Sequence, residues 1–301
     1  MTVRVPGTTS NLGSGFDTLG LALQLYNRVT VLPRSQRGAG IVSPIADDAR
    51  EGATTMVSDA ARLFFRRTGK PSFGFNISIT GDVPVARGLG SSTTVQLGLL
   101  VALNELSGAG LDRHGIFELV NVLEGHPDNA APATFGGFTV AGPVGRSTRV
   151  LRFPVPRQAR FITLIPDFEV RTADARRLLP AQYPKADLVH SLNRVALVSA
   201  ALATGQLEAL RDLFDDRVHQ THRTPLIPQL PKVVAAGVKA GAIGGWLSGS
   251  GSTIMCLTTR DTEAVAVAML RQIPGGQVQV LKPDVSGYQL VPDPPVTSPK
   301  P

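Results

Sequence analysis

A glycine-rich turn followed by hydroxyl side chains and a long apolar segment is the strongest chemical signal in this sequence. Residues 83–99 read Val-Pro-Val-Ala-Arg-Gly-Leu-Gly-Ser-Ser-Thr-Thr-Val-Gln-Leu-Gly-Leu, after a strand-like run at 73–79, and the apolar segment continues to Leu106. Such a turn at the start of a helix leaves backbone N–H groups unpaired at the positive end of the helix dipole. This terminus can bind phosphate without a cationic side chain. We therefore expect a phosphate site at Gly88, Gly90, Ser91 and Ser92, although an ordinary capped helix has the same local pattern.

Other common nucleotide-binding motifs are absent from the sequence. No Gly-x4-Gly-Lys-Ser/Thr segment is present, no Gly-x-Gly-x-x-Gly follows a strand-like run, and the motif set of protein kinases is missing. A phosphate group bound at residues 88–92 would therefore be held by a scheme that does not use a P-loop lysine.

The composition is that of a globular protein with one large or two medium domains. The chain has 301 residues, of which 43% are hydrophobic and 18% charged. No apolar run approaches the roughly 18 residues of a membrane span, and residues 1–6 lack the apolar core of a signal peptide. The single cysteine, Cys256, lies in an apolar run, which predicts a buried thiol and excludes an internal disulfide. We expect a cytoplasmic protein with no membrane partner.

The net charge of +7 does not carry a nucleic-acid pattern. Basic residues are scattered, with short clusters such as Arg66-Arg67 and Arg176-Arg177, and no zinc-finger, RNP-type or basic-aromatic motif accompanies them. We expect no nucleic-acid partner. A mildly positive surface favours anionic small molecules.

Hydrophobic periodicity interleaves strands and helices without a regular βαβ array. The pattern predicts an α+β protein with domains at 1–155 and 156–290 and a proline-rich, disordered tail at 291–301. Strands are expected at 2–5, 26–32, 73–79, 138–141, 148–153 and 159–165, within 246–258, and from 278. Helices are expected after the glycine turn, from 262, and at 52–67, 112–123, 186–204, 206–219 and 229–240.

Five segments together resemble a known enzyme superfamily. Residues 6–17 (Pro-Gly-Thr-Thr-Ser-Asn-Leu-Gly-Ser-Gly-Phe-Asp), the glycine–serine turn, and residues 245–253 (Gly-Trp-Leu-Ser-Gly-Ser-Gly-Ser-Thr) resemble the three GHMP kinase motifs, in the same order. Residues 124–129 (Glu-Gly-His-Pro-Asp-Asn) and 216–223 (Asp-Arg-Val-His-Gln-Thr-His-Arg) resemble the homoserine kinases of that superfamily. The resemblance implies the GHMP kinase fold, with a ribosomal protein S5 domain 2-like N-terminal domain that binds ATP. It also implies a ferredoxin-like C-terminal domain and a cleft between the two.

The resemblance also implies a site for ATP and Mg²⁺. Ser92 and Glu124 would hold the metal, since a hard cation prefers oxygen ligands, and Glu124 counts among the catalytic residues. The residues expected to contact the nucleotide are Pro84, Arg87, Gly88, Leu89, Gly90, Ser91, Ser92 and Thr93.

Homoserine presents an ammonium, a carboxylate and a hydroxyl, and the resemblance supplies a partner for each. Asp17 would pair with the ammonium, while Arg176 and Arg223 would clamp the carboxylate, because a guanidinium suits two oxygens. Asn11 and Asp128 would orient the attacking hydroxyl, and Asp128 acts either as a general base or only by orientation. The histidines are assigned no chemistry and are expected to be structural: His126, His219 and His222.

The implied activity is ATP- and Mg²⁺-dependent phosphorylation of L-homoserine to O-phospho-L-homoserine, a step of threonine biosynthesis. Two alternatives stay open: a GHMP kinase for another small alcohol, and a non-catalytic binding protein with this fold. Thr55-Met56 stands where homoserine kinases often carry an adenine-contacting asparagine, and Ser252 stands where the third motif usually has proline. A homodimer is compatible with the resemblance, but no segment of the sequence marks an interface.

Overall fold

The computed structural model describes residues 1–43 and 47–291. Residues 292–301 of the expected disordered tail lie outside the described residues. In chain order the elements are β1 (Thr2–Ser10), β2 (Leu19–Arg34), β3 (Ala39–Ile41), α1 (Asp47–Thr68), β4 (Gly74–Gly81), α2 (Ser91–Ser107), α3 (Arg113–Glu124), α4 (Pro127–Phe135), β5 (Phe138–Val144), β6 (Ser147–Phe153), β7 (Arg160–Ile165), α5 (Thr172–Arg177), α6 (Lys185–Thr204), η1 (Leu207–Leu210), α7 (Gln220–Arg223), η2 (Thr224–Leu226), α8 (Leu230–Lys239), β8 (Gly244–Leu247), β9 (Ile254–Thr258), α9 (Thr262–Leu270), β10 (Gln277–Leu281) and β11 (Gln289–Val291).

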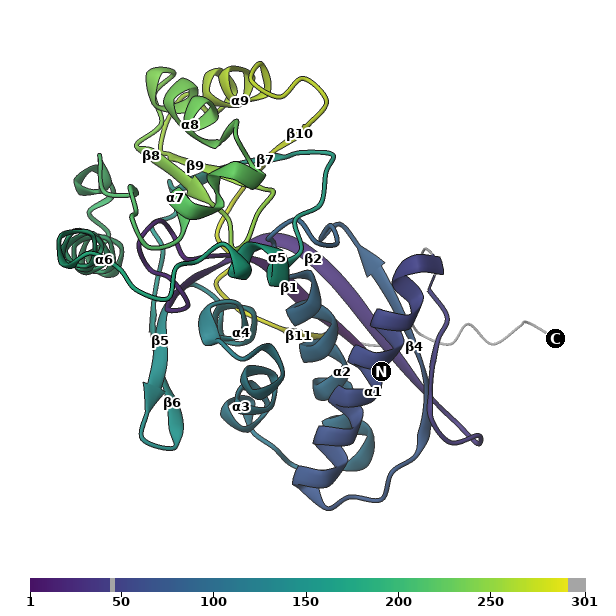
Figure 1. Cartoon of the computed structure of the whole chain (residues 1–301). Helices are drawn as coiled ribbons and strands as arrows, with labels where there is room; N and C mark the ends of the chain where they lie inside the picture. The colour runs from purple at the N-terminus through teal and green to yellow at the C-terminus, as the bar shows by residue number, and fades with distance from the viewer. Residues whose placement is uncertain (44–46, 292–301) are drawn as a thin grey trace.

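The first sheet carries four helices on one face (Figure 1). Its strand order is β11-β1-β2-β4-β3, and β2 also pairs with β5, which pairs with β6. Helices α1 to α4 pack over these strands and enclose an apolar core that includes Phe64, Phe75, Leu100 and Phe117. Helix α2, which follows the glycine turn, has twelve buried residues and is the central helix of this layer.

The second sheet is a βαββαβ arrangement. Its order is β10-β7-β9-β8, with every neighbouring pair antiparallel. Helices α8 and α9 pack against it over a core that includes Ile162, Val233, Cys256 and Val265. The order and direction of these strands are those of a ferredoxin-like domain, so the expected α+β class is confirmed. Cys256 is buried as expected, and burial raises the pKa of its thiol to about 12.

A third apolar core joins the two sheets. Leu21 and Leu23 of β2 belong to it together with Phe214 and Trp246, whose rings stack at 4.7 Å. The far half of β2 contributes Val29 to the helix-covered core instead. One long strand therefore anchors both layers, and the register of its pairing with β1 shifts between the two halves.

The expected helix at 206–219 is wrong. The structure has only the short η1 there, and α7 begins at Gln220. The carboxylate of Asp216 accepts hydrogen bonds from the backbone N–H groups of Val218, His219 and Gln220 at 3.0, 2.7 and 2.7 Å. Side chains of this kind offer the backbone an alternative to helical hydrogen bonds. Helices α4 and α5, which position residues of the cleft, were not predicted from the sequence.

The end of the described chain returns to the first sheet, which corrects the expected domain end at 290 and the tail at 291. Strand β11 pairs antiparallel with β1, with Val291 opposite Thr2. The guanidinium of Arg113 donates to the carbonyl oxygens of Thr134, Ser286 and Tyr288 at 2.7 to 2.9 Å. Residues 284–291 therefore belong structurally with the N-terminal layer.

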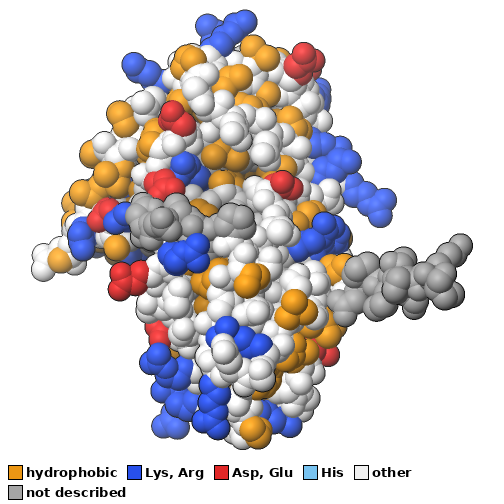
Figure 2. Space-filling model, turned by 90° about the vertical axis from the view of Figure 1, so that its right-hand side faces the viewer, with side chains coloured by type: hydrophobic (Ala, Val, Ile, Leu, Met, Phe, Trp, Pro, Cys, Tyr) orange, Lys and Arg blue, Asp and Glu red, His pale blue; other side chains and the backbone are white. Residues whose placement is uncertain are grey.

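Basic side chains lie in separate groups over the face drawn in Figure 2, with acidic groups between them. None of the helices in the described part of the chain is long and apolar enough to cross a bilayer.

We predict that Arg113→Ala lowers the free energy of unfolding by about 2–3 kcal/mol, because three charge-assisted hydrogen bonds are lost, two to Ser286 and Tyr288 of the returning segment and one to Thr134 of α4. Urea denaturation checks this value. Arg149→Ala, on the exposed face of β6, is the control and should change it by less than about 0.5 kcal/mol. Equal stability of the two variants would show that Arg113 does not fasten the segment.

Candidate functional site

A cleft of about 800 Å³ lies where the two layers meet and collects most of the predicted site residues. Pro84 and Leu89 were expected to contact the nucleotide, but neither residue lines this cleft. Leu89 is instead fully buried in the core between the sheets. The predicted residues that do line it are Asn11, Asp17, Arg87, Gly88, Gly90, Ser91, Ser92, Thr93, Glu124, Asp128, Arg176 and Arg223. Met56 also lines this cleft.

The glycine turn presents free backbone N–H groups to this cleft. Gly90 is the N-cap of α2, with φ 70°, and no side chain of the described residues caps the helix. The first hydrogen bond of the helix runs from Thr94 N to Gly90 O. The N–H groups of residues 91–93 therefore have no helical acceptor, which is the arrangement that favours an anion at a helix N-terminus.

The turn is held by the glycine-rich loop after β8. The hydroxyl of Ser248 donates to Gly88 O at 2.6 Å and contacts Thr9 Oγ1 at 2.9 Å, and Thr253 N donates to Arg87 O. A Cβ on Gly88 would lie 2.1 Å from the Ser248 carbonyl oxygen. The close approach of these two loops therefore requires glycine at 88.

The guanidinium of Arg87 is occupied outside the cleft. It donates to the carbonyl oxygens of Pro166 and Asp167 at 3.1 and 2.9 Å and pairs with Glu169 at 3.2 Å. Its side chain thus links the turn to the segment after β7, and it contributes to the cleft without offering a free charge.

Glu124 and Ser92 form an oxygen-rich pair beside the helix N-terminus. Ser92 Oγ donates to Glu124 Oε2 at 3.4 Å. Burial raises the pKa of the Glu124 carboxyl, and His126 and Ser92 offset part of this effect. A hydroxyl and a carboxylate are donors of the kind that Mg²⁺ prefers, so these residues fit such an ion.

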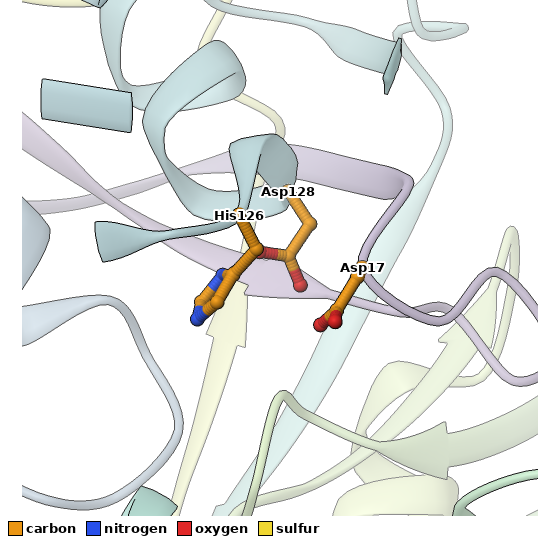
Figure 3. A group of neighbouring side chains, drawn as sticks. All are labelled: Asp17, His126 and Asp128. Atoms are coloured by element: carbon orange, nitrogen blue, oxygen red, sulfur yellow. The ribbon is translucent and has the colours of Figure 1, made fainter. Parts of the chain in front are cut away.

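Asp17, His126 and Asp128 point toward one another from three positions along the chain (Figure 3). Their ligand atoms lie within 4.8 Å of each other, and His126 Nδ1 is 2.7 Å from Asp128 Oδ1. Asp128 is 2% exposed, at the start of α4. Asn129 extends the network, because its amide contacts Thr8, Ser10 and Asp128 at 2.7 to 3.3 Å. The sequence analysis gave His126 and Asn129 no role in the cleft, although both lie in the 124–129 motif.

Asp17 and Arg176 form a bidentate ion pair across the cleft. Arg176 Nη2 and Nη1 donate to Asp17 Oδ1 and Oδ2 at 2.7 and 3.1 Å, and both side chains are about one-third exposed. Asn11 supports this pair, since its Oδ1 accepts from Asp17 N at 3.1 Å and its Nδ2 donates to Gly249 O. Two groups predicted to bind opposite ends of one substrate therefore bind each other here.

Arg223 is a buried cation whose partners are neutral. It is 2% exposed, and its Nη1 donates to Gly249 O at 3.0 Å and to His219 Nδ1 at 3.2 Å. Its Nε has no partner, and no carboxylate of the described residues lies within ion-pair distance. Burial, together with the nearby Arg176, lowers the pKa of Arg223 to about 10. Asp17, Asp128 and Asp216 offset part of this effect without pairing directly with Arg223. A buried charge without a direct counter-ion is unfavourable, so this position favours an incoming anion.

Family models, curated relatives and solved structures all match this chain to the same group of kinases, and the relatives and structures do so over most of its length. Family models match residues 55–137 (GHMP kinases N terminal domain) and 198–273 (GHMP kinases C terminal). A homoserine kinase of Deinococcus radiodurans is 40% identical over 85% of this chain and 83% of that protein. One from Clostridium kluyveri is 34% identical over 96% of this chain and 98% of that protein. The crystal structure of a homoserine kinase from Cytophaga hutchinsonii has a TM-score of 0.86 at 28% identity, covering 97% of each chain.

We predict that Gly88→Ala lowers the free energy of unfolding by more than the strain of placing alanine at a positive φ. Gly110 has nearly the same φ, +74° against +75°, but a Cβ at residue 110 would meet no atom within 4 Å, so Gly110→Ala is the matched control. The control should lose about 1–2 kcal/mol of unfolding free energy. Gly88→Ala should lose about 1–3 kcal/mol more because its Cβ meets backbone. Urea denaturation of both variants tests this, and equal losses would contradict it.

We predict that Glu124→Gln stabilises the metal-free protein at neutral pH. Burial places the folded-state pKa of the Glu124 carboxyl above its ordinary value of 4.5. The protonated carboxyl therefore contributes fully to the stability of the folded state below pH 4.5, and this stability is lost as the pH rises through the folded-state pKa. The stability gain of the variant should therefore shrink as the pH falls toward 4.5. Thermal unfolding with EDTA between pH 4.5 and 8 measures it, with the exposed Glu263→Gln as control. A variant less stable than wild type at pH 8 would refute the assignment.

Proposed function

Since this chain belongs to the homoserine kinases of the GHMP kinase family, we propose that its cleft transfers the terminal phosphoryl group of ATP to the side-chain hydroxyl of L-homoserine. The product is O-phospho-L-homoserine, which is a precursor of threonine. We further propose that the enzyme acts in the cytoplasm.

One observation carries the choice of substrate: the charges at one end of the cleft complement an amino-acid zwitterion. Asp17 offers a carboxylate to an ammonium group, and Arg176 and Arg223 offer guanidinium groups to a carboxylate. The Asp17–Arg176 pair is partly exposed, so a zwitterion entering the cleft can replace each partner with an equivalent charge. The substrate carboxylate would give Arg223 a direct counter-ion, which none of the described residues provides.

The triphosphate would lie against the N-terminus of α2. The unpaired N–H groups of residues 91–93 and the hydroxyls of Ser91 and Ser92 are donors for its oxygens. Ser92 and Glu124 would hold Mg²⁺, which neutralises charge on the transferring phosphoryl group when it is bound.

The hydroxyl of homoserine would be oriented by Asp128. His126 Nδ1 contacts one oxygen of this carboxylate, and the other oxygen, which no described residue binds, can accept the hydroxyl hydrogen. Asn129 holds the same carboxylate from the side. Because phosphoryl transfer through a loose transition state depends mainly on positioning and charge neutralisation, orientation of the hydroxyl is the contribution we assign to Asp128.

The test of the reaction is Mg²⁺-dependent ADP release in the presence of L-homoserine, L-threonine, L-serine or mevalonate, and without an acceptor. We expect strong stimulation by L-homoserine. Mevalonate has a carboxylate but no ammonium group, so it cannot replace Arg176 as the partner of Asp17. Turnover of mevalonate without turnover of homoserine would favour a kinase for another alcohol. Silence with every acceptor would favour a binding protein.

We predict that Arg176→Ala raises the KM for L-homoserine about tenfold or more, because a charge-assisted contact is worth about 1.5–3 kcal/mol. The KM for ATP should stay within about twofold. Arg177→Ala is the matched control, since Arg177 is adjacent in sequence, 79% exposed and paired only with Asp174 among the described residues. Steady-state kinetics of both variants test this, and an equal rise in the two variants would remove Arg176 from the substrate site.

A further inference from the structure

His219 contacts Arg223, which lines the cleft, but His219 does not line the cleft itself. It precedes α7 and is fully buried, with Nε2 2.7 Å from Gly13 O and Nδ1 3.2 Å from Arg223 Nη1. We propose that His219 is a positioning residue that fixes the guanidinium of Arg223 for the carboxylate of the amino-acid substrate. This inference rests on the proposed function and gives a role to a histidine that the sequence analysis treated as structural.

The hydrogen bonds determine the tautomer of the ring. A backbone carbonyl only accepts, so Nε2 must carry the proton that is donated to Gly13. A guanidinium only donates, so Nδ1 must be the unprotonated nitrogen that accepts from Arg223. The imidazole ring therefore connects the backbone of Gly13, in the loop between β1 and β2, to the guanidinium of Arg223 on α7.

The neutral ring is also the form that its surroundings favour. Burial lowers the pKa of His219 to about 4, with Arg223 acting in the same direction and Asp216 opposing it. A proton on Nδ1 would point at the Arg223 guanidinium and remove its acceptor. Near neutral pH the lone pair on Nδ1 is consequently always available to Arg223.

The contacts of Arg223 leave a defined edge for a ligand. The two hydrogens of Nη1 are taken by His219 and Gly249, so Nη2 remains for a carboxylate, while Nε is buried without a partner among the described residues. The ring of Phe16 supports this orientation, because it stacks on His219 at 5.2 Å and lies 5.2 Å from Arg223 Cζ. The same ring lies 5.3 Å from Arg176 Cζ, so one aromatic side chain contacts both expected carboxylate-binding groups.

Two substitutions separate the two hydrogen bonds of His219. In His219→Asn, the amide oxygen can take the place of Nδ1 and accept from Arg223, while the bond to Gly13 is lost. In His219→Gln, the amide nitrogen can take the place of Nε2 and donate to Gly13, while the acceptor for Arg223 is lost. Thermal unfolding of both variants reports their structural cost, and steady-state kinetics report the KM values for L-homoserine and ATP.

We expect His219→Gln to raise the KM for L-homoserine at least tenfold and His219→Asn to raise it less than threefold, with little change in the KM for ATP. In an Arg223→Ala background, His219→Gln should add no further rise, because the residue through which it acts is gone. Equal rises in the two single variants, or a full additional rise in the Arg223→Ala background, would overturn the proposal and leave a structural role.

The failure of this inference is distinguishable from failure of the proposed function. Wild-type protein that shows no homoserine-dependent ADP release removes the proposed function and this inference with it. Wild-type protein with normal turnover but the wrong variant pattern removes only this inference. Imidazole ¹⁵N–¹H correlation spectra at pH 7 add a readout besides activity: we expect the neutral Nε2–H tautomer for His219, and an Nδ1–H tautomer would overturn the inference.

Discussion

The carbonyl oxygen of Gly249 is the contact on which the cleft depends. It accepts from Asn11 Nδ2 at 3.1 Å and from Arg223 Nη1 at 3.0 Å, so it joins the loop after β1, the loop after β8 and α7 at one atom. The neighbouring Ser248 binds the glycine turn before α2. The nucleotide side and the amino-acid side of the cleft are thus positioned by one short loop. A displacement of this loop would move both sides together, which keeps the expected phosphoryl donor and acceptor in register.

The charges of the amino-acid side are arranged for exchange rather than for maximum stability. Asp17 and Arg176 pair with each other in the free protein, whereas the hydrogen-bond acceptors of Arg223 within the described part of the chain are neutral. A cation that is buried among neutral partners destabilises the folded chain, and the cost is recovered when an anion arrives. The pocket is consequently poised for a ligand with both charges, and a ligand with only one of them leaves one of these groups without a partner.

Local patterns were sufficient to predict most elements and the glycine turn of the cleft, because glycine turns, capping residues and apolar periodicity act over short distances. The other cleft residues were expected from the resemblance to a known family. They did not predict how the cleft residues pair. Asp17 and Arg176 are 159 residues apart, and Gly13 and His219 are 206 apart, so only the folded chain brings them together. The expected helix at 206–219 failed for a related reason. The apolar spacing of this segment fits a helix. However, the Asp216 carboxylate accepts from backbone N–H groups that follow it in the chain, such as that of His219, and it also accepts from Ser191 on α6.

The return of the chain to its first sheet has a consequence for synthesis. The second sheet is built from one continuous stretch, from β7 to β10, and can form as soon as that stretch has left the ribosome. The first sheet needs β1, which is made first, and β11, which is made last among the described strands. Until β11 arrives, one edge of β1 is an open strand of the kind that pairs with other chains. The second sheet can therefore complete its folding before the first sheet does, because the first sheet lacks its final strand until β11 has been translated.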